Sequence, residues 1–177
     1  MQVREATIHD AEGIAKVHVD SWRTTYKGII PEEFLKNLFY EQRTELWINN
    51  IKRTDSFVVI AENTEGEIIG FADCWKRETN TITDSGDLTS IYILDEYQGQ
   101  GVGKELLKKL FVRFNSLGYQ KIFVDVLEDN KTRYFYEYYG AHLSTSVQIK
   151  IGGKILNELI YEWDNVDDVL ARLTKTD

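Results

Sequence analysis

Three glycines stand close together in the middle of the chain. Gly99, Gly101 and Gly103 lie between an apolar run, SIYIL (90–94), and an amphipathic run at 105–118. Glycine-rich turns between a strand and a helix often hold phosphates, because backbone N–H groups and the helix N-terminus face the anion. The spacing therefore predicts a ligand that carries phosphate.

Two common phosphate-binding turns do not fit this segment. A P-loop would need a glycine at Gln98 and a hydroxyl residue at Glu105. The dinucleotide pattern Gly-x-Gly-x-x-Gly would need its third glycine at Lys104.

A third pattern, Gln/Arg-x-x-Gly-x-Gly/Ala, does fit, and with it the chain resembles the GNAT family of acyl-CoA-dependent N-acetyltransferases. Small residues let the backbone come close to a pyrophosphate. Basic residues follow on the predicted helix, although the whole chain is acidic: Lys104, Lys108, Lys109 and Arg113. A tight turn without a ligand is the alternative. The resemblance implies that acetyl-CoA is held by Gln98, Gly99, Gln100, Gly101, Val102, Gly103 and Lys104.

A second segment, NKTRYFYEYYG (130–140), looks like the other cofactor segment of the family. The resemblance covers about residues 2–163, and Asp95 departs from it where many members have proline. It implies an α/β fold with a mixed, mostly antiparallel, twisted sheet of about seven strands, helices on both faces and a splayed parallel strand pair. It also implies direct transfer of acetyl to a primary amine.

The resemblance gives Tyr136 the role of general acid toward the CoA sulfur. A phenol with a pKa of about 10 can protonate a thiolate whose conjugate acid has a pKa of about 8.5, if it is held close. Packing in the core is the alternative for Tyr136. Asn130 would bind the pantetheine amides, cap a helix, or do both. Backbone N–H groups of Ile91, Tyr92 and Ile93 would bind the pantetheine arm and the thioester oxygen.

Asp87 stands where many relatives carry a glutamate that acts as the base. An ordinary aspartate, with a pKa of about 3.9, is a poor base for an ammonium, so burial or a chain of waters would be needed. An ordinary turn carboxylate is the alternative. Cys74 has no histidine signature nearby, so we expect no covalent intermediate. The three histidines show no metal-ligand spacing, and we expect no metal.

The resemblance places the acceptor pocket between the first two helices and the late hairpin. It nominates Trp22, Tyr26, Phe34 and, from the sheet, Trp75. Aromatic rings can bind an amine through cation–π contacts, and they also form cores. The expected acceptor is a small cationic metabolite or antibiotic. A protein N-terminus or lysine is the alternative, as is a non-catalytic module that senses acyl-CoA.

The elements that must position these residues follow from hydrophobic periodicity. Helices are predicted at 9–26, at 32–38 with Pro31 as first residue, at 40–53, at 102–117 up to Gly118, and at 130–140. Strands are predicted at 2–8, 56–62, 67–75, 87–94, 121–127, 142–151 and 154–163. The helical crossover at 102–117 predicts a right-handed connection between parallel strands. The last dozen residues form a weak helix or fray.

Composition sets the remaining bounds. A length of 177 residues with 42% hydrophobic residues predicts one domain, 1–177, with a real core. A net charge of −8 argues against binding to nucleic acids or anionic membranes and favours a cationic small molecule. One cysteine, no apolar run long enough for a membrane span and no secretion signal predict a cytoplasmic protein. The late hairpin leaves a homodimer open.

Overall fold

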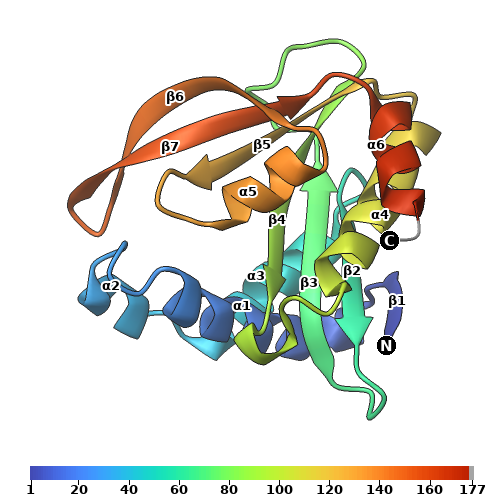
Figure 1. Cartoon of the computed structure of the whole chain (residues 1–177). Helices are drawn as coiled ribbons and strands as arrows, with labels where there is room; N and C mark the ends of the chain where they lie inside the picture. Colours follow the sequence, from blue (N-terminus) through green and yellow to red (C-terminus); the bar gives the residue numbers. More distant parts are fainter. Residues whose placement is uncertain (176–177) are drawn as a thin grey trace.

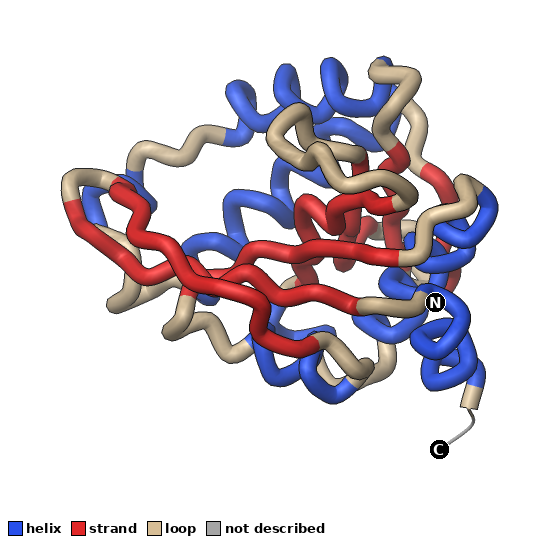
Figure 2. The backbone as a smooth tube through the Cα atoms, turned by 90° about the horizontal axis from the view of Figure 1, so that it is seen from above, coloured by secondary structure: helices blue, strands red, loops and turns tan. Residues whose placement is uncertain are grey.

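The computed structural model describes residues 1–175, which form one twisted seven-stranded sheet in the order β1-β2-β3-β4-β5-β7-β6 (Figure 1 and Figure 2). Neighbouring strands are antiparallel except for β4 and β5. This confirms the predicted mixed, mostly antiparallel sheet. The strands are β1 (Gln2–Glu5), β2 (Phe57–Glu62), β3 (Ile68–Trp75), β4 (Ser85–Ile93), β5 (Lys121–Leu127), β6 (His142–Ile151) and β7 (Lys154–Trp163).

Helices cover both faces of the sheet (Figure 1). In the described residues they are α1 (Ala11–Thr25), α2 (Glu32–Lys36), α3 (Tyr40–Lys52), α4 (Val102–Ser116), α5 (Thr132–Tyr138) and α6 (Val166–Thr174). On β2, Val58 and Ile60 pack into a cluster with α1 and α3, whereas Val59 and Ala61 pack into a cluster with α4 and α6. Burial on both faces explains why this strand is a continuous apolar run.

The parallel pair β4–β5 parts halfway along its length. Ladder pairs run from Ser85 with Lys121 to Leu88 with Val124. Beyond them β4 continues to Ile93 and keeps its pairing with β3, while β5 continues to Leu127 beside β7. The two strands diverge in Figure 1, and α5 lies in front of the opening. The predicted splayed pair is therefore present.

Several boundaries differ by a few residues from the sequence-based expectation, and two of them have a clear local reason. The first strand ends at Glu5 because a 3₁₀ turn (Ile8–Asp10) follows, fastened by a hydrogen bond of 2.7 Å from the Thr7 N–H to the Asp10 carboxylate. Pro31 is the N-cap of α2 and not its first residue, since its ψ of 135° is extended.

The chain end resolves to a helix, α6, which is capped by the Asn165 side chain and buries Val166, Val169 and Leu173 against the core. Among residues 1–175, no helix has the length and apolar character that a membrane crossing requires.

Candidate active site

The glycine turn adopts the backbone shape that its sequence requires. Gly99 and Gly101 have positive φ angles of 72° and 83°, and Gly101 is the N-cap of α4. A side chain at Gly103 would stand 3.3 Å from Ile93 and Phe135, so glycine also allows the helix to pack closely there. Among the described residues, no backbone N–H from Gly99 to Gly103 has a hydrogen-bond partner. Unpartnered N–H groups at a helix N-terminus suit an anion.

The polar side chains of the turn hold it in shape. Gln98 donates from Nε2 to the last carbonyl of β4 at 3.3 Å, and Gln100 donates to the Glu96 carbonyl at 2.8 Å. Lys104 donates from Nζ to the Lys175 carbonyl at 2.8 Å, which ties the turn to the end of α6. Both glutamine side chains therefore bond within the turn, and their contact with the cofactor stays a prediction.

Three tyrosines meet where β4 and β5 part. The hydroxyls of Tyr26, at the end of α1, and Tyr92, on β4, are hydrogen-bonded at 2.8 Å. Asn130 donates from Nδ2 to Tyr26 at 3.3 Å. Tyr136, on α5, is buried as a residue, and no described residue forms a hydrogen bond with its hydroxyl. The hydroxyl is not among the fully enclosed polar atoms that lack a partner, so it keeps some access from outside.

Burial sets the protonation of all three phenols. It is the main cause that raises the pKa of Tyr26, Tyr92 and Tyr136 above the ordinary tyrosine value. Each hydroxyl therefore keeps its proton at neutral pH and can donate it.

Asn130 lies just before α5, whose N-cap is Lys131, and its binding to the pantetheine arm stays a prediction. Its Oδ1 accepts the N–H of Thr132, the first residue of α5, at 2.9 Å. Its Nδ2 points to Tyr26, toward the parted strands. The bond to Thr132 fixes the side chain in that direction.

Three of the four aromatic residues nominated for the acceptor pocket form one cluster. The Trp22 ring lies 4.8 Å from Tyr26 and 6.5 Å from Phe34, centroid to centroid. Trp75 does not join them: its ring lies under the Arg53 guanidinium, 4.0 Å away, at the other end of β3. None of the four lines either of the pockets described below.

The cluster also contains a histidine that sequence reasoning missed. His18 stacks on Tyr92 at 5.9 Å and accepts the Trp47 indole N–H at Nδ1, at 3.0 Å. Burial lowers its pKa to about 3, so the imidazole is neutral at pH 7. Its helical spacing with Trp22 and Tyr26 could have indicated that it belongs to this cluster, since the three residues share one face of α1 and its C-terminal end.

Asp87 lies at the paired end of β4. Its Oδ2 accepts the Arg77 N–H at 3.0 Å and the Asn80 amide at 2.9 Å, and the residue is buried. It holds the segment that joins β3 to β4 and borders a pocket of about 300 Å³. The pocket is lined by Arg77, Thr79, Asn80, Thr81, Ile82, Asp87, Phe123, Asp125 and Ile160, with Arg77 ion-paired to Asp125.

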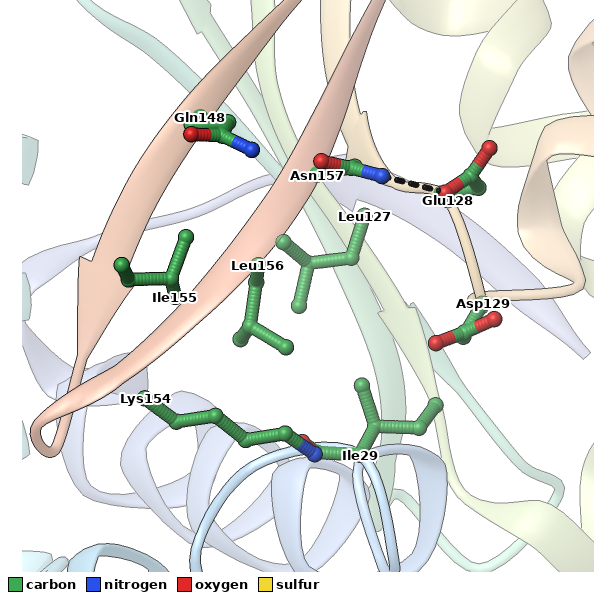
Figure 3. A pocket seen from close by; sticks show the side chains of 9 residues that line it. All are labelled: Ile29, Leu127, Glu128, Asp129, Gln148, Lys154, Ile155, Leu156 and Asn157. Carbon is green, nitrogen blue, oxygen red and sulfur yellow. Dashed lines mark hydrogen bonds between the residues drawn. The ribbon is translucent and has the colours of Figure 1, made fainter.

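A second pocket, of about 230 Å³, lies beyond the tip of β5 between the loop after α1 and the β6–β7 hairpin (Figure 3). The resemblance led us to expect an acceptor pocket in this position. The lining is apolar and acidic with one lysine: Ile29, Leu127, Glu128, Asp129, Gln148, Lys154, Ile155, Leu156 and Asn157. Lys154 donates to the Ile29 carbonyl and Asn157 to Glu128, both at 2.8 Å.

One group of potential metal ligands occurs in the described residues: His142, Glu162 and Asp164. Lys121 already supplies a cation there, with its Nζ 3.0 Å from Glu162 and 3.1 Å from Asp164. The group lies where β6 begins and β7 ends.

Comparison with known proteins gives the chain its relatives. The profile of the acetyltransferase (GNAT) family matches residues 17–141. An uncharacterized N-acetyltransferase of Bacillus subtilis, YuaI, is 35% identical over 173 residues, 98% of each chain.

Two further relatives match in part, and they differ in their acceptors. A ribosomal protein bS18 alanine N-acetyltransferase of Haemophilus influenzae is 42% identical over 42% of this chain and 47% of its own length. A spermidine N(1)-acetyltransferase of Thermoplasma acidophilum is 29% identical over 60% of this chain and 66% of its own length.

The fold recurs among solved structures. The PaiA N-acetyltransferase of Thermoplasma acidophilum, solved with coenzyme A, superposes with a TM-score of 0.75 at 24% identity, covering 92% of this chain and 98% of that one. With a family match over most of its length and a relative that spans it almost end to end, the chain belongs to the acetyltransferase (GNAT) family.

Proposed function

We propose that this acetyltransferase, whose donor is acetyl-CoA, moves the acetyl group to the primary amine of a small cationic molecule. The parted β4–β5 pair carries the proposal, because it brings a buried, unpartnered phenol beside free strand edges at one end and an anion-binding turn at the other. Donor pyrophosphate would lie against the turn from Gln98 to Lys104. The pantetheine arm would run along β4 toward Tyr136, with Asn130 beside it.

The reaction needs a held carbonyl and a proton for the leaving thiolate. Backbone N–H groups at Ile91, Tyr92 and Ile93 are our candidates for the carbonyl oxygen, and one such donor can contribute about 3 kcal/mol of transition-state stabilisation. Tyr136 would protonate the thiolate. That phenol is protonated over the working pH range, as a proton donor must be, and the burial that raises its pKa also makes it a weaker acid, so donation depends on close contact with the sulfur. Asp87 as the base stays a prediction.

The acceptor class follows from charge. The two pockets that flank β5 together present four carboxylates, from Asp87, Asp125, Glu128 and Asp129. This surplus favours an ammonium, and the partial similarity to a spermidine acetyltransferase supports a small polycation. A protein N-terminus is the second candidate, supported by the partial similarity to the bS18 alanine enzyme. The aromatic cluster would pack behind the acceptor site, with Trp22, Tyr26 and Phe34 as its members. Trp75 lies at the other end of β3, and no observation supports it as part of that site. The cytoplasmic location and a homodimer stay predictions.

The test measures thiol release from acetyl-CoA with polyamines, aminoglycosides, amino acids and short peptides, with a blank lacking acceptor. Tyr136→Phe should lower kcat by about 10²- to 10³-fold while acetyl-CoA affinity stays the same. Removing an unpartnered hydroxyl should leave the unfolding free energy nearly unchanged. Release with peptides alone would favour the second candidate. Full turnover of the Tyr136→Phe variant would remove Tyr136 from the mechanism.

A further inference from the structure

One carboxylate near the parted strands has no role in the proposed mechanism. Glu158 lies on β7 and is half-buried, yet no described residue gives its side-chain carboxylate a hydrogen bond or an ion pair. Its neighbours differ in this respect. Asp87 accepts two hydrogen bonds, and Asp125 is ion-paired with Arg77. Among these three carboxylates, Glu158 is the one for which the described chain supplies neither a hydrogen bond nor an ion pair.

The strand register places Glu158 between the pocket of about 300 Å³ and Tyr26. Asp125 stands opposite Ile160, and both line the pocket of about 300 Å³. Two residues further along each strand, on the same face, Leu127 stands opposite Glu158. Leu127 packs in one cluster with Tyr26, whose hydroxyl is bonded to Tyr92 and Asn130.

An electrostatic effect agrees with this position. Burial is the main cause that raises the pKa of Tyr26, and the Glu158 carboxylate adds to it.

We propose that Glu158 is the general base that takes the proton from the acceptor ammonium, an assignment that rests on the proposed function. The freed amine attacks the thioester carbonyl, so that the C–N bond forms and the C–S bond breaks. Tyr136 gives its proton to the departing thiolate and recovers one from the nitrogen of the attacking amine. The products are the acetylated amine and the thiol, and Glu158 releases its proton to solvent.

The surroundings of Glu158 suit a base. Burial, and then the Asp125 carboxylate, raise the pKa of Glu158 above that of an ordinary glutamate, while Arg77 lowers it. Asp125, on β5, and Arg77, in the segment after β3, are the charged groups that shift it, and Glu158 in turn acts on Tyr26 at the end of α1. A raised pKa makes the carboxylate a better proton acceptor, and Asp125 beside it favours a cation between them.

The experiment compares the pH profile of kcat/KM for the wild type, Glu158→Gln and Asp125→Asn, with Glu65→Gln in the exposed β2–β3 hairpin as a matched control. A base must be deprotonated, so wild-type activity should fall as the pH drops through the pKa of Glu158. The Glu158→Gln variant should lose about 10²- to 10³-fold in kcat and lose this acid limb.

Asp125→Asn removes a like charge, so its acid limb should move to lower pH with Glu158 still in place. Acetyl-CoA affinity should be the same in all four proteins. A Glu158→Gln variant with the wild-type kcat and acid limb overturns the assignment, as does transfer of both effects to Asp87→Asn. A wild type that is silent with every amine overturns the proposed function, and the base assignment with it.

Discussion

Alanine at Gly101 tests whether the turn before α4 is a donor site or only a tight turn. The φ of 83° lies in the left-handed region, where an L-residue costs about 1–2 kcal/mol of folding free energy. A methyl group there meets no protein atom within 4 Å, so the fold should lose little beyond this backbone strain. The open space that it enters is the proposed place of the pyrophosphate. A pyrophosphate pushed away by the methyl group would lose one charge-assisted hydrogen bond to the turn. This loss should weaken acetyl-CoA binding by about 10- to 100-fold.

Gly118, at the other end of the same helix, is the matched control. It has a φ of 74°, and a methyl group would again meet nothing within 4 Å. The 15 residues of α4 separate the two glycines by about 22 Å. Gly118→Ala should therefore cost about the same stability in urea unfolding and leave the dissociation constant of acetyl-CoA unchanged in titration calorimetry.

The two measurements together separate strain from binding. Equal losses of stability with a loss of affinity in Gly101→Ala alone would support the anion-binding turn. Equal affinity in the two variants would refute it, because the only difference assigned to Gly101 is its place in the donor site.

Three further changes probe other parts of the structure. Tyr26→Phe removes hydrogen bonds to Tyr92 and Asn130 and should lower the unfolding free energy by about 1–3 kcal/mol in urea titration, unlike Tyr136→Phe. Asp10, whose pKa is lowered to about 2 chiefly by its hydrogen bond with Arg4, should stabilise the fold by about 2 kcal/mol above pH 4, a gain lost as the pH falls through about 2. Asp10→Asn should therefore destabilise the protein at pH 7 and match the wild type in acid unfolding. Asp87→Asn, if Asp87 only holds the β3–β4 segment, should lower the melting temperature and leave the acid limb of the pH profile in place.

Much of the fold was predictable because local signals agreed with the tertiary structure. The β6–β7 hairpin and β5 have the expected bounds, since apolar alternation and Gly152-Gly153 mark them clearly. Gly118 ends α4 with a positive φ, as its position after the last periodic residue indicated. The chain end was ambiguous because a nine-residue helix depends on packing against the core.

The candidate site was only partly predictable. The glycine turn and Tyr136 carry a local motif, and the structure places both beside the parted strands. Glu158 and Asp125 carry none: each is an isolated carboxylate in an apolar strand, and only the β5–β7 register brings them together. Trp75 was nominated by its residue type. Strand length and register decide at which end of β3 it stands, and residue type does not reveal them.

The parted pair also makes the sheet incomplete. Strand edges along the second half of β4 and β5 have no ladder partner across the opening in the described chain. An extended arm with amide groups can supply those missing bonds, so that the donor would act as an eighth strand and become part of the fold that binds it. Donor binding should then slow hydrogen exchange along β4 and β5 and raise the melting temperature by mass action. In this protein the loss of substrate and the loosening of the sheet would be the same event.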